Sequence, residues 1–208
     1  MTIPESLPVW ALIPVKDFAR GKSRLDVLDA HERERFARGL FDHVLAAVME
    51  CDELAGVAIV TDSDAVAELA RKCGAVAIPD TPSASLGGIV DAALDALAAR
   101  GAYGVVVVMS DLPCVEPDEL RAMVRELRGH DVVVAPDLRD EGTNALALRL
   151  PGRGPTSFGN ARSFAMHCER AAMRGARLSV QRSAGLGFDV DVPSDLEQLR
   201  AHPDALAR

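Results

Sequence analysis

Five consecutive apolar residues, Val105–Met109, place the strongest constraint on the fold because no polar residue alternates with them. An apolar run without alternation is typical of a strand buried on both faces of a parallel sheet. Proline has no N–H for a strand ladder, so we expect this strand to end before Pro113. A strand of this kind requires helices on both faces of the sheet, which predicts an α/β fold.

Asp111 follows this run and is expected at the carboxyl end of a central strand. Open α/β sheets bind their ligands at that edge. A carboxylate fixed there suits a hard cation, and a hard cation suits phosphates. Asp111 can equally cap the next turn or the helix near Pro117, and the stretch by itself favours neither interpretation.

Along the rest of the chain, short apolar runs alternate with segments of helical periodicity. Strands are predicted at Val9–Pro14, Gly56–Thr61, Ala75–Ile78, Asp131–Ala135 and Ala176–Arg182. This order predicts a mostly parallel sheet with right-handed crossovers. We therefore expect one domain over residues 1–208, a three-layer sandwich of Rossmann-like type.

The composition argues against several classes of protein. The chain is 49% hydrophobic and 26% charged, as expected of a globular domain with a sizeable core. A net charge of −8 argues against a nucleic acid or a membrane surface as partner. No apolar run approaches the roughly 20 residues of a membrane span, and we see no secretory signal. Four scattered cysteines without a CxxC motif fit neither a zinc site nor a disulfide scaffold. We therefore expect the protein to be located in the reducing cytoplasm.

A cationic loop, Lys16–Arg24, follows the first predicted strand and precedes a helix that begins near Ala30. A strand, a basic loop and a helix together can hold a polyphosphate. Lys16 and Lys22 supply point charges, and Arg24 can make a bidentate contact. The loop can also be a solvated surface segment, but its place after the first strand favours the functional interpretation. Neither a Walker A motif nor a GxGxxG motif is present there.

Two further loops carry candidate binding residues. Small residues around Gly87, before the next helix, allow a nucleobase or ribose to approach the backbone, although an ordinary loop also explains them. The polar turn Gly142–Asn144 can bind a phosphate or carboxylate through Thr143, or it can be a hairpin turn.

A third candidate region enters a helix between Ser157 and His167. Gly159, Arg162 and Ser163 lie near the predicted helix start, which is a natural anion site. His167 falls one turn after Ser163 on the same face, but a lone histidine is more often structural.

Two acidic residues near the end of the chain, Asp189 and Asp191, alternate with apolar neighbours and so point to the same side of an extended segment. With Asp111 they can form a carboxylate metal site. In the alternative interpretation, Asp191 or Ser194 caps the last helix. The metal interpretation requires Asp111 to lie close to Asp189 or Asp191, with the cationic loop facing the same cleft.

Taken in order, several segments resemble one known family across nearly the whole chain. The segments are VKDFARGKSRL, SDLP, GTNAL, FGNARSFAMH and FDVDVPSDL. They resemble the guanylyltransferases of deazaflavin coenzyme (coenzyme F-420) biosynthesis, usually named 2-phospho-L-lactate guanylyltransferases. MobA-like and sugar-phosphate nucleotidyltransferases are relatives of that family, so the resemblance implies a fold of the nucleotide-diphospho-sugar transferase type.

The resemblance also implies roles for individual residues. The triphosphate of GTP would be contacted by Lys16, Lys22, Ser23 and Arg24. Mg²⁺ would be bound by Asp111 together with Asp189 or Asp191. The phosphorylated acid would be held by Thr143, Gly159 and Ser163, with Arg162 as a further candidate. Lys22, Arg24 and Asp111 would act directly in catalysis.

The implied reaction joins GMP from GTP to a phosphorylated three-carbon acid and releases pyrophosphate. The acceptor is 2-phospho-L-lactate, phosphoenolpyruvate or 3-phospho-D-glycerate, and a longer loop between Gly159 and Ser163 favours an acceptor other than the first. A homodimer is possible. Alternatives are a nucleotidyltransferase with another base or acceptor, a glycosyltransferase of the same fold, and a non-catalytic GTP-binding module.

Overall fold

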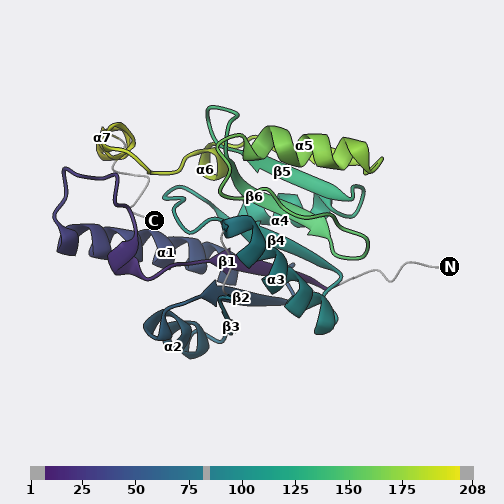
Figure 1. Cartoon of the computed structure of the whole chain (residues 1–208), viewed down its shortest axis with the longest axis horizontal. Coiled ribbons are helices and arrows are strands. Elements are labelled where there is room, and N and C mark those ends of the chain that lie inside the picture. The colour runs from purple at the N-terminus through teal and green to yellow at the C-terminus, as the bar shows by residue number, and fades with distance from the viewer. Residues whose placement is uncertain (1–7, 82–84, 202–208) are drawn as a thin grey trace.

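The computed structural model describes residues 8–81 and 85–201 of the 208-residue chain (Figure 1). Within these residues, seven strands form one sheet in the order β3-β2-β1-β4-β6-β5-β7. The strands are β1 Val9–Pro14, β2 Gly56–Thr61, β3 Val76–Pro79, β4 Gly104–Val108, β5 Val132–Pro136, β6 Thr143–Arg149 and β7 Leu178–Val180. The predicted strands are therefore present, with β7 shorter than its apolar segment suggested.

Most neighbouring strands run parallel. β1 pairs in parallel with β2 and β4, β2 with β3, and β5 with β7. β6 is the exception, because it runs antiparallel to both β4 and β5. The polar segment Gly142–Asn144 therefore ends the turn of a β5–β6 hairpin, and Thr143 opens the returning strand.

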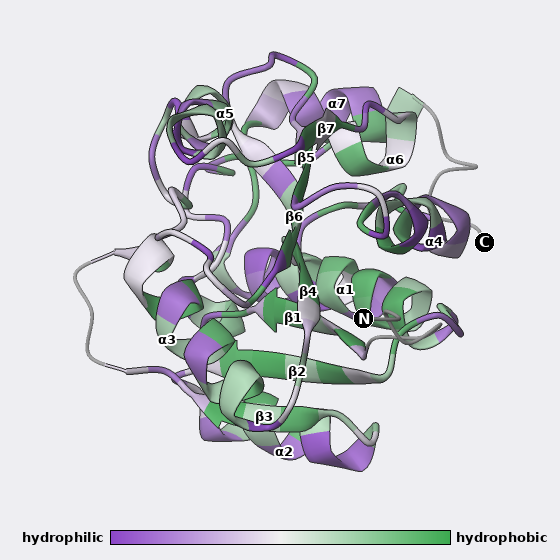
Figure 2. Cartoon of the chain, turned by 90° about the vertical axis from the view of Figure 1, so that its right-hand side faces the viewer, coloured by the Kyte–Doolittle hydropathy of each residue, from purple (hydrophilic) through white to green (hydrophobic). Residues whose placement is uncertain are grey.

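The helices are α1 Ala30–Met49, α2 Asp64–Lys72, α3 Leu86–Ala99, α4 Pro117–Glu126, α5 Ser163–Met173, α6 Ala184–Gly187 and α7 Pro193–Ala201, with a short 3₁₀ helix η1 at Phe18–Arg20. Figure 2 shows α3 and α5 on one face of the sheet and α1, α4 and α6 on the other. The apolar side chains of α2 join the second group. The three-layer α/β prediction is confirmed.

The central strand β4 shows why five apolar residues occur in a row. Val106 and Val108 pack toward α1 and α4, and Val105 and Val107 pack toward α3. All four side chains are at most 1% exposed. Both faces of this strand are covered, so neither side can carry a polar residue. β4 ends at Val108, before Pro113 as predicted.

The strand ends that are followed by polar residues lie at one edge of the sheet. β1, β2, β3 and β4 are mutually parallel, so their carboxyl ends lie together. The antiparallel strand β6 begins at the same edge, because Ala145 pairs with Val108 and the Met109 N–H donates to the Asn144 carbonyl at 2.9 Å. In the part of the chain that the structure describes, no helix has the length and apolar character to cross a bilayer.

Candidate active site

A cleft of about 430 Å³ opens at this edge of the sheet. Its walls come from the loop after β1 and from residues at the ends of β2, β3 and β4. Six residues singled out in the sequence line it, namely Lys16, Lys22, Ser23, Arg24, Asp111 and Asp191. A volume of this size is typical of a site for a small molecule.

Three carboxylates meet at one side of the cleft. Asp111, Asp189 and Asp191 each offer one oxygen, and the three oxygens lie within 4.8 Å of one another. The backbone supports this approach, because the Val190 N–H donates to the Asp111 carbonyl at 3.4 Å. The capping alternative for Asp111 is wrong for α4, since that helix starts after Glu116.

Lys22 bridges two of these acids. Its Nζ lies 2.6 Å from Asp111 Oδ2 and 3.0 Å from Asp191 Oδ1, and its side chain is only 9% exposed. Burial alone would lower the pKa of Lys22, but the charges of Asp111 and Asp191 together raise it above its ordinary value. The ammonium therefore stays charged and balances part of the negative charge of the cluster.

Local structure in the loop explains how Lys22 reaches the acids. Its φ of 52° is a left-handed value that turns the chain back toward the sheet. Leu25, which follows, is fully buried in a small cluster with Val190 and Leu196. Phe18 packs on Phe41 of α1 with ring centroids 5.5 Å apart. Both ends of the cationic loop are therefore anchored.

Asp189 is half-buried and is held by a hydrogen bond from β6. Asn144 Nδ2 donates to its Oδ1 at 3.2 Å. Burial, followed by the nearby charge of Asp111, raises the pKa of Asp189 to about 6, and the Asn144 hydrogen bond opposes that rise. Three converging carboxylates are the oxygen donor set that a hard cation such as Mg²⁺ takes. The residues present therefore fit such an ion.

The remaining cations of the loop divide into two groups. Arg24 is 74% exposed at its side chain and lies 3.7 Å from Asp191, so its guanidinium stays available to a ligand in the cleft. Lys16 is exposed and also lines the cleft. Arg20 instead forms an ion pair with Asp62 at the end of β2.

Asp80, just after β3, is a cleft residue that the sequence analysis missed. Its Oδ1 is buried and has no hydrogen-bond partner among the residues that the structure describes. Burial, and then the charge of Asp62, raises the pKa of Asp80, while Lys16 and Arg20 oppose the rise. An acid after a predicted strand was the signal that could have identified it. A buried carboxylate oxygen without a donor suggests a donor supplied by a ligand.

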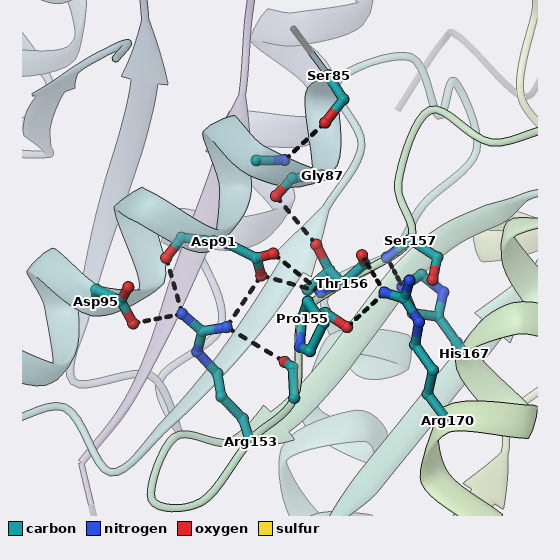
Figure 3. Close-up of polar contacts among 12 residues, drawn as sticks. Ser85, Gly87, Asp91, Asp95, Arg153, Pro155, Thr156, Ser157, His167 and Arg170 are labelled. Carbon is teal, nitrogen blue, oxygen red and sulfur yellow. Dashed lines mark hydrogen bonds and ion pairs between the residues drawn. The ribbon is translucent and has the colours of Figure 1, made fainter. Parts of the chain in front are cut away.

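The predicted acceptor residues Thr143 and Ser163 lie together, but in a buried group rather than on an open surface. Ser163 Oγ lies 3.2 Å from Thr143 Oγ1, which lies 3.0 Å from His167 Nδ1. The Ser157 N–H donates to His167 Nε2 at 2.8 Å (Figure 3). Gly159 is exposed, has a φ of 81°, and approaches Leu86 of the cleft wall.

Gly87 and Arg162, like Thr143, Gly159 and Ser163, are not among the residues that line the cleft. The Gly87 N–H donates to the Phe158 carbonyl at 3.1 Å. The Gly87 carbonyl accepts from Thr156 Oγ1 at 3.3 Å, as Figure 3 shows. Its small size serves this close contact between α3 and the loop before α5. The Arg162 side chain is 76% exposed and lies 4.0 Å from Glu169.

Residues 9–206 match the family model described as guanylyl transferase CofC like. The chain belongs to this family. It is therefore a nucleotidyltransferase, as the sequence resemblance predicted.

The names of two similar proteins agree with this family assignment. The chain is 38% identical over 193 residues to the phosphoenolpyruvate guanylyltransferase of Sphaerobacter thermophilus, covering 92% of each chain. It is 36% identical to the protein of the same name from Rubrobacter xylanophilus, covering 94% of this chain and 95% of that one.

Solved structures support the fold. A putative nucleotide-diphospho-sugar transferase from Desulfovibrio desulfuricans superposes with a TM-score of 0.79 at 18% identity, over 92% of this chain and 85% of that one. At this level of identity the likeness shows that the fold is shared.

Proposed function

We propose that this enzyme transfers GMP from GTP to phosphoenolpyruvate and releases pyrophosphate. The observation that carries the proposal is the cluster of Lys22 with Asp111 and Asp191 in a cleft that the cationic loop also lines. The choice of phosphoenolpyruvate is supported by the names of the two relatives above. The assignment to deazaflavin coenzyme biosynthesis rests on the sequence resemblance.

In the proposed reaction the protein needs only to position the two substrates and to stabilise the charge on their phosphate groups. An oxygen of the acceptor phosphate would attack the α-phosphorus of GTP, and the bond from that phosphorus to the bridging oxygen of pyrophosphate would break. A phosphate dianion is already a nucleophile near neutral pH, so no general base is needed. Catalysis would then come from orientation and electrostatic stabilisation.

The cationic loop supplies that stabilisation in our proposal. Lys22 is rigidly held and would face the α-phosphate, where charge shifts during transfer. Arg24 and Lys16 lie more openly in the cleft and would bind the leaving pyrophosphate. Asp111, Asp189 and Asp191 would hold Mg²⁺. When bound, the ion neutralises phosphate charge.

The strand order supports one orientation of GTP in our proposal. Asp80 follows β3 and Asp111 follows β4, and β2 and β1 lie between these two strands. Three strand spacings correspond to about 14 Å, enough to separate the base from the α-phosphate. We infer that the guanine lies toward Asp80, because its N1–H and N2–H groups can both donate to one carboxylate. Adenine lacks this pair of donors.

One experiment tests the proposed function. The purified protein is incubated with GTP, Mg²⁺ and each of phosphoenolpyruvate, 3-phospho-D-glycerate and 2-phospho-L-lactate, and the products are identified by mass spectrometry. We expect a guanosine diphosphate ester of the enol acid, formed faster than either other product. Faster transfer to another phospho-acid would refute the acceptor assignment. Transfer to none of them, with turnover of a sugar phosphate, would refute the proposed function.

A further inference from the structure

A buried hydrogen-bonded chain links the loop before α5 to the first residue of β6. It runs from the Ser157 N–H to His167, from His167 to Thr143, and from Thr143 to Ser163. Thr143, Ser163 and His167 are each no more than 6% exposed. The proposed reaction needs no proton from this histidine, so its place beside two candidate acceptor residues calls for another explanation.

The backbone fixes the tautomer of His167. A backbone N–H can only donate, so the Ser157 N–H, 2.8 Å from Nε2, requires an unprotonated Nε2. A neutral imidazole then carries its proton on Nδ1. Nδ1 lies 3.0 Å from Thr143 Oγ1, so His167 donates and Thr143 accepts. Burial, with a smaller contribution from Arg170, lowers the pKa of His167 to about 4, so the ring is neutral at physiological pH.

Counting protons shows the consequence of this tautomer. Thr143 and Ser163 have one hydroxyl proton each, and the hydrogen bond between them uses one of the two. His167 takes neither, because it is itself a donor. One hydroxyl proton of the pair is therefore left without an acceptor among the described residues. With the opposite tautomer, Nδ1 would accept from Thr143 and both protons would be used.

We propose that His167 is a positioning residue that keeps the Thr143–Ser163 hydroxyl pair as a hydrogen-bond donor toward an anionic acceptor substrate. The proposal rests on the proposed function, because it takes the acceptor to be a phosphorylated acid. The phosphate and carboxylate groups of such an acid only accept hydrogen bonds when ionised. A pair that presents a donor binds them, whereas a pair that presents lone pairs repels them.

The loop that carries Ser157 is held firmly enough to set this direction. Arg153 bonds Asp91 at 3.0 Å and Asp95 at 2.5 Å, both on α3 (Figure 3). The Thr156 N–H donates to Asp91 at 3.0 Å. The Phe158 ring meets the imidazole edge-on, with centroids 5.1 Å apart. The loop that bonds His167 is therefore itself held on α3 by several hydrogen bonds and ion pairs.

Paired substitutions test the role through kinetics. Thr143→Val removes the hydroxyl at nearly constant shape, and we expect KM for phosphoenolpyruvate to rise about tenfold or more while KM for GTP stays within about twofold. Thr143→Ser should restore most of the loss. His167→Asn can still donate at the Nδ1 position, so it should keep a lower acceptor KM than His167→Gln. Equal changes in both KM values across these variants would indicate a merely structural role and overturn the proposal.

A spectroscopic test does not depend on turnover. In protein labelled with ¹⁵N at histidine, the His167 ring should show a protonated Nδ1 and an unprotonated Nε2 at pH 7, with its signals assigned by their loss in His167→Asn. A ring protonated at Nε2 would overturn the proposal even if the enzyme transfers GMP. Absence of transfer to every phospho-acid, with the Nδ1–H tautomer present, would refute the proposed function and with it the acceptor role of the pair.

Discussion

The Lys22 ammonium lies 2.6 Å from a carboxylate oxygen of Asp111, although 89 residues separate the two in sequence. The contact ties the cationic loop after β1 to the end of β4, the neighbouring strand. The contact places a fixed positive charge beside the carboxylates of Asp111, Asp189 and Asp191, which could together bind a metal ion. In the proposed reaction both charges would act on the same phosphate groups.

Replacing Lys22 by methionine should reduce kcat by about a hundredfold or more, because a fixed charge at the reacting phosphate is lost while the aliphatic stem is kept. Pyrophosphate release under saturating GTP measures the change. Lys72→Met is the matched control, since Lys72 is 70% exposed and its one ion pair among the described residues is with Glu68 on its own helix. A Lys22→Met enzyme as active as the Lys72→Met control would contradict the proposed role.

Replacing Asp80 by asparagine should change which base the enzyme accepts. The amide offers a donor where the carboxylate offered only acceptors, so KM for GTP should rise about tenfold or more. Xanthosine triphosphate, whose base carries an oxygen in place of the 2-amino group, should improve relative to GTP. Asp42→Asn, at an exposed pair with Arg38 on α1, provides the control. An unchanged preference for GTP would place the guanine elsewhere.

The free energy of unfolding should decrease at acidic pH, because His167 has a lower pKa in the folded protein than in the unfolded chain. Its folded-state pKa is about 4 and its ordinary value is 6.5, so the unfolded chain binds the proton more readily. The stabilising contribution is complete above pH 6.5 and is lost as the pH falls toward 4, by about 3 kcal/mol in all.

Urea unfolding of the wild type and of His167→Asn between pH 7 and pH 4 measures this contribution as a difference. The comparison removes the opposite effect of Asp189, whose raised pKa makes the folded state more stable as the pH falls through about 6. Parallel curves for the two proteins would show that His167 is not the titrating group.

Gly185 should tolerate no side chain. A Cβ there would lie 2.1 Å from Glu119 Oε2 and 2.3 Å from the Cys114 carbonyl, so Gly185→Ala should destabilise the fold by about 2 kcal/mol or more. It should also disturb the acids that follow α6. Gly39→Ala on α1 meets nothing within 4 Å and should stabilise by about 0.5 to 1 kcal/mol. Thermal unfolding compares the two, and similar melting temperatures would contradict the close contact.

Much of the arrangement could be predicted because parallel strands end at one edge. The run Val105–Met109 indicated a doubly covered strand, and that strand places Asp111 beside the loop after β1. The meeting of Asp111 with Lys22 was expected on this basis, and the structure contains it. Asp189 and Asp191 were expected beside them and do lie there, but they come from the segment after α6 rather than from the end of a strand. Their roles in catalysis stay predictions.

Other parts depend on tertiary contacts that leave little local signal. Thr143 reaches the site edge only because β6 runs antiparallel, and a polar turn did not reveal that direction. His167 looked like an ordinary structural histidine, because its partner Ser157 is a backbone group ten residues away. The small size of Gly87 suggested a ligand contact, but it serves packing against Phe158.

The most direct test of the account compares wild type with Asp111→Asn in the transfer of GMP from GTP to phosphoenolpyruvate, with Mg²⁺ present and the product quantified by mass spectrometry. The substitution keeps the shape of the side chain and removes the charge that pairs with Lys22 and would help to hold the ion. We expect the wild type to form the product and the variant to lose at least about a hundredfold in rate while keeping its fold by circular dichroism. A variant that transfers GMP at close to the wild-type rate would contradict the claim that this acid cluster is the catalytic centre.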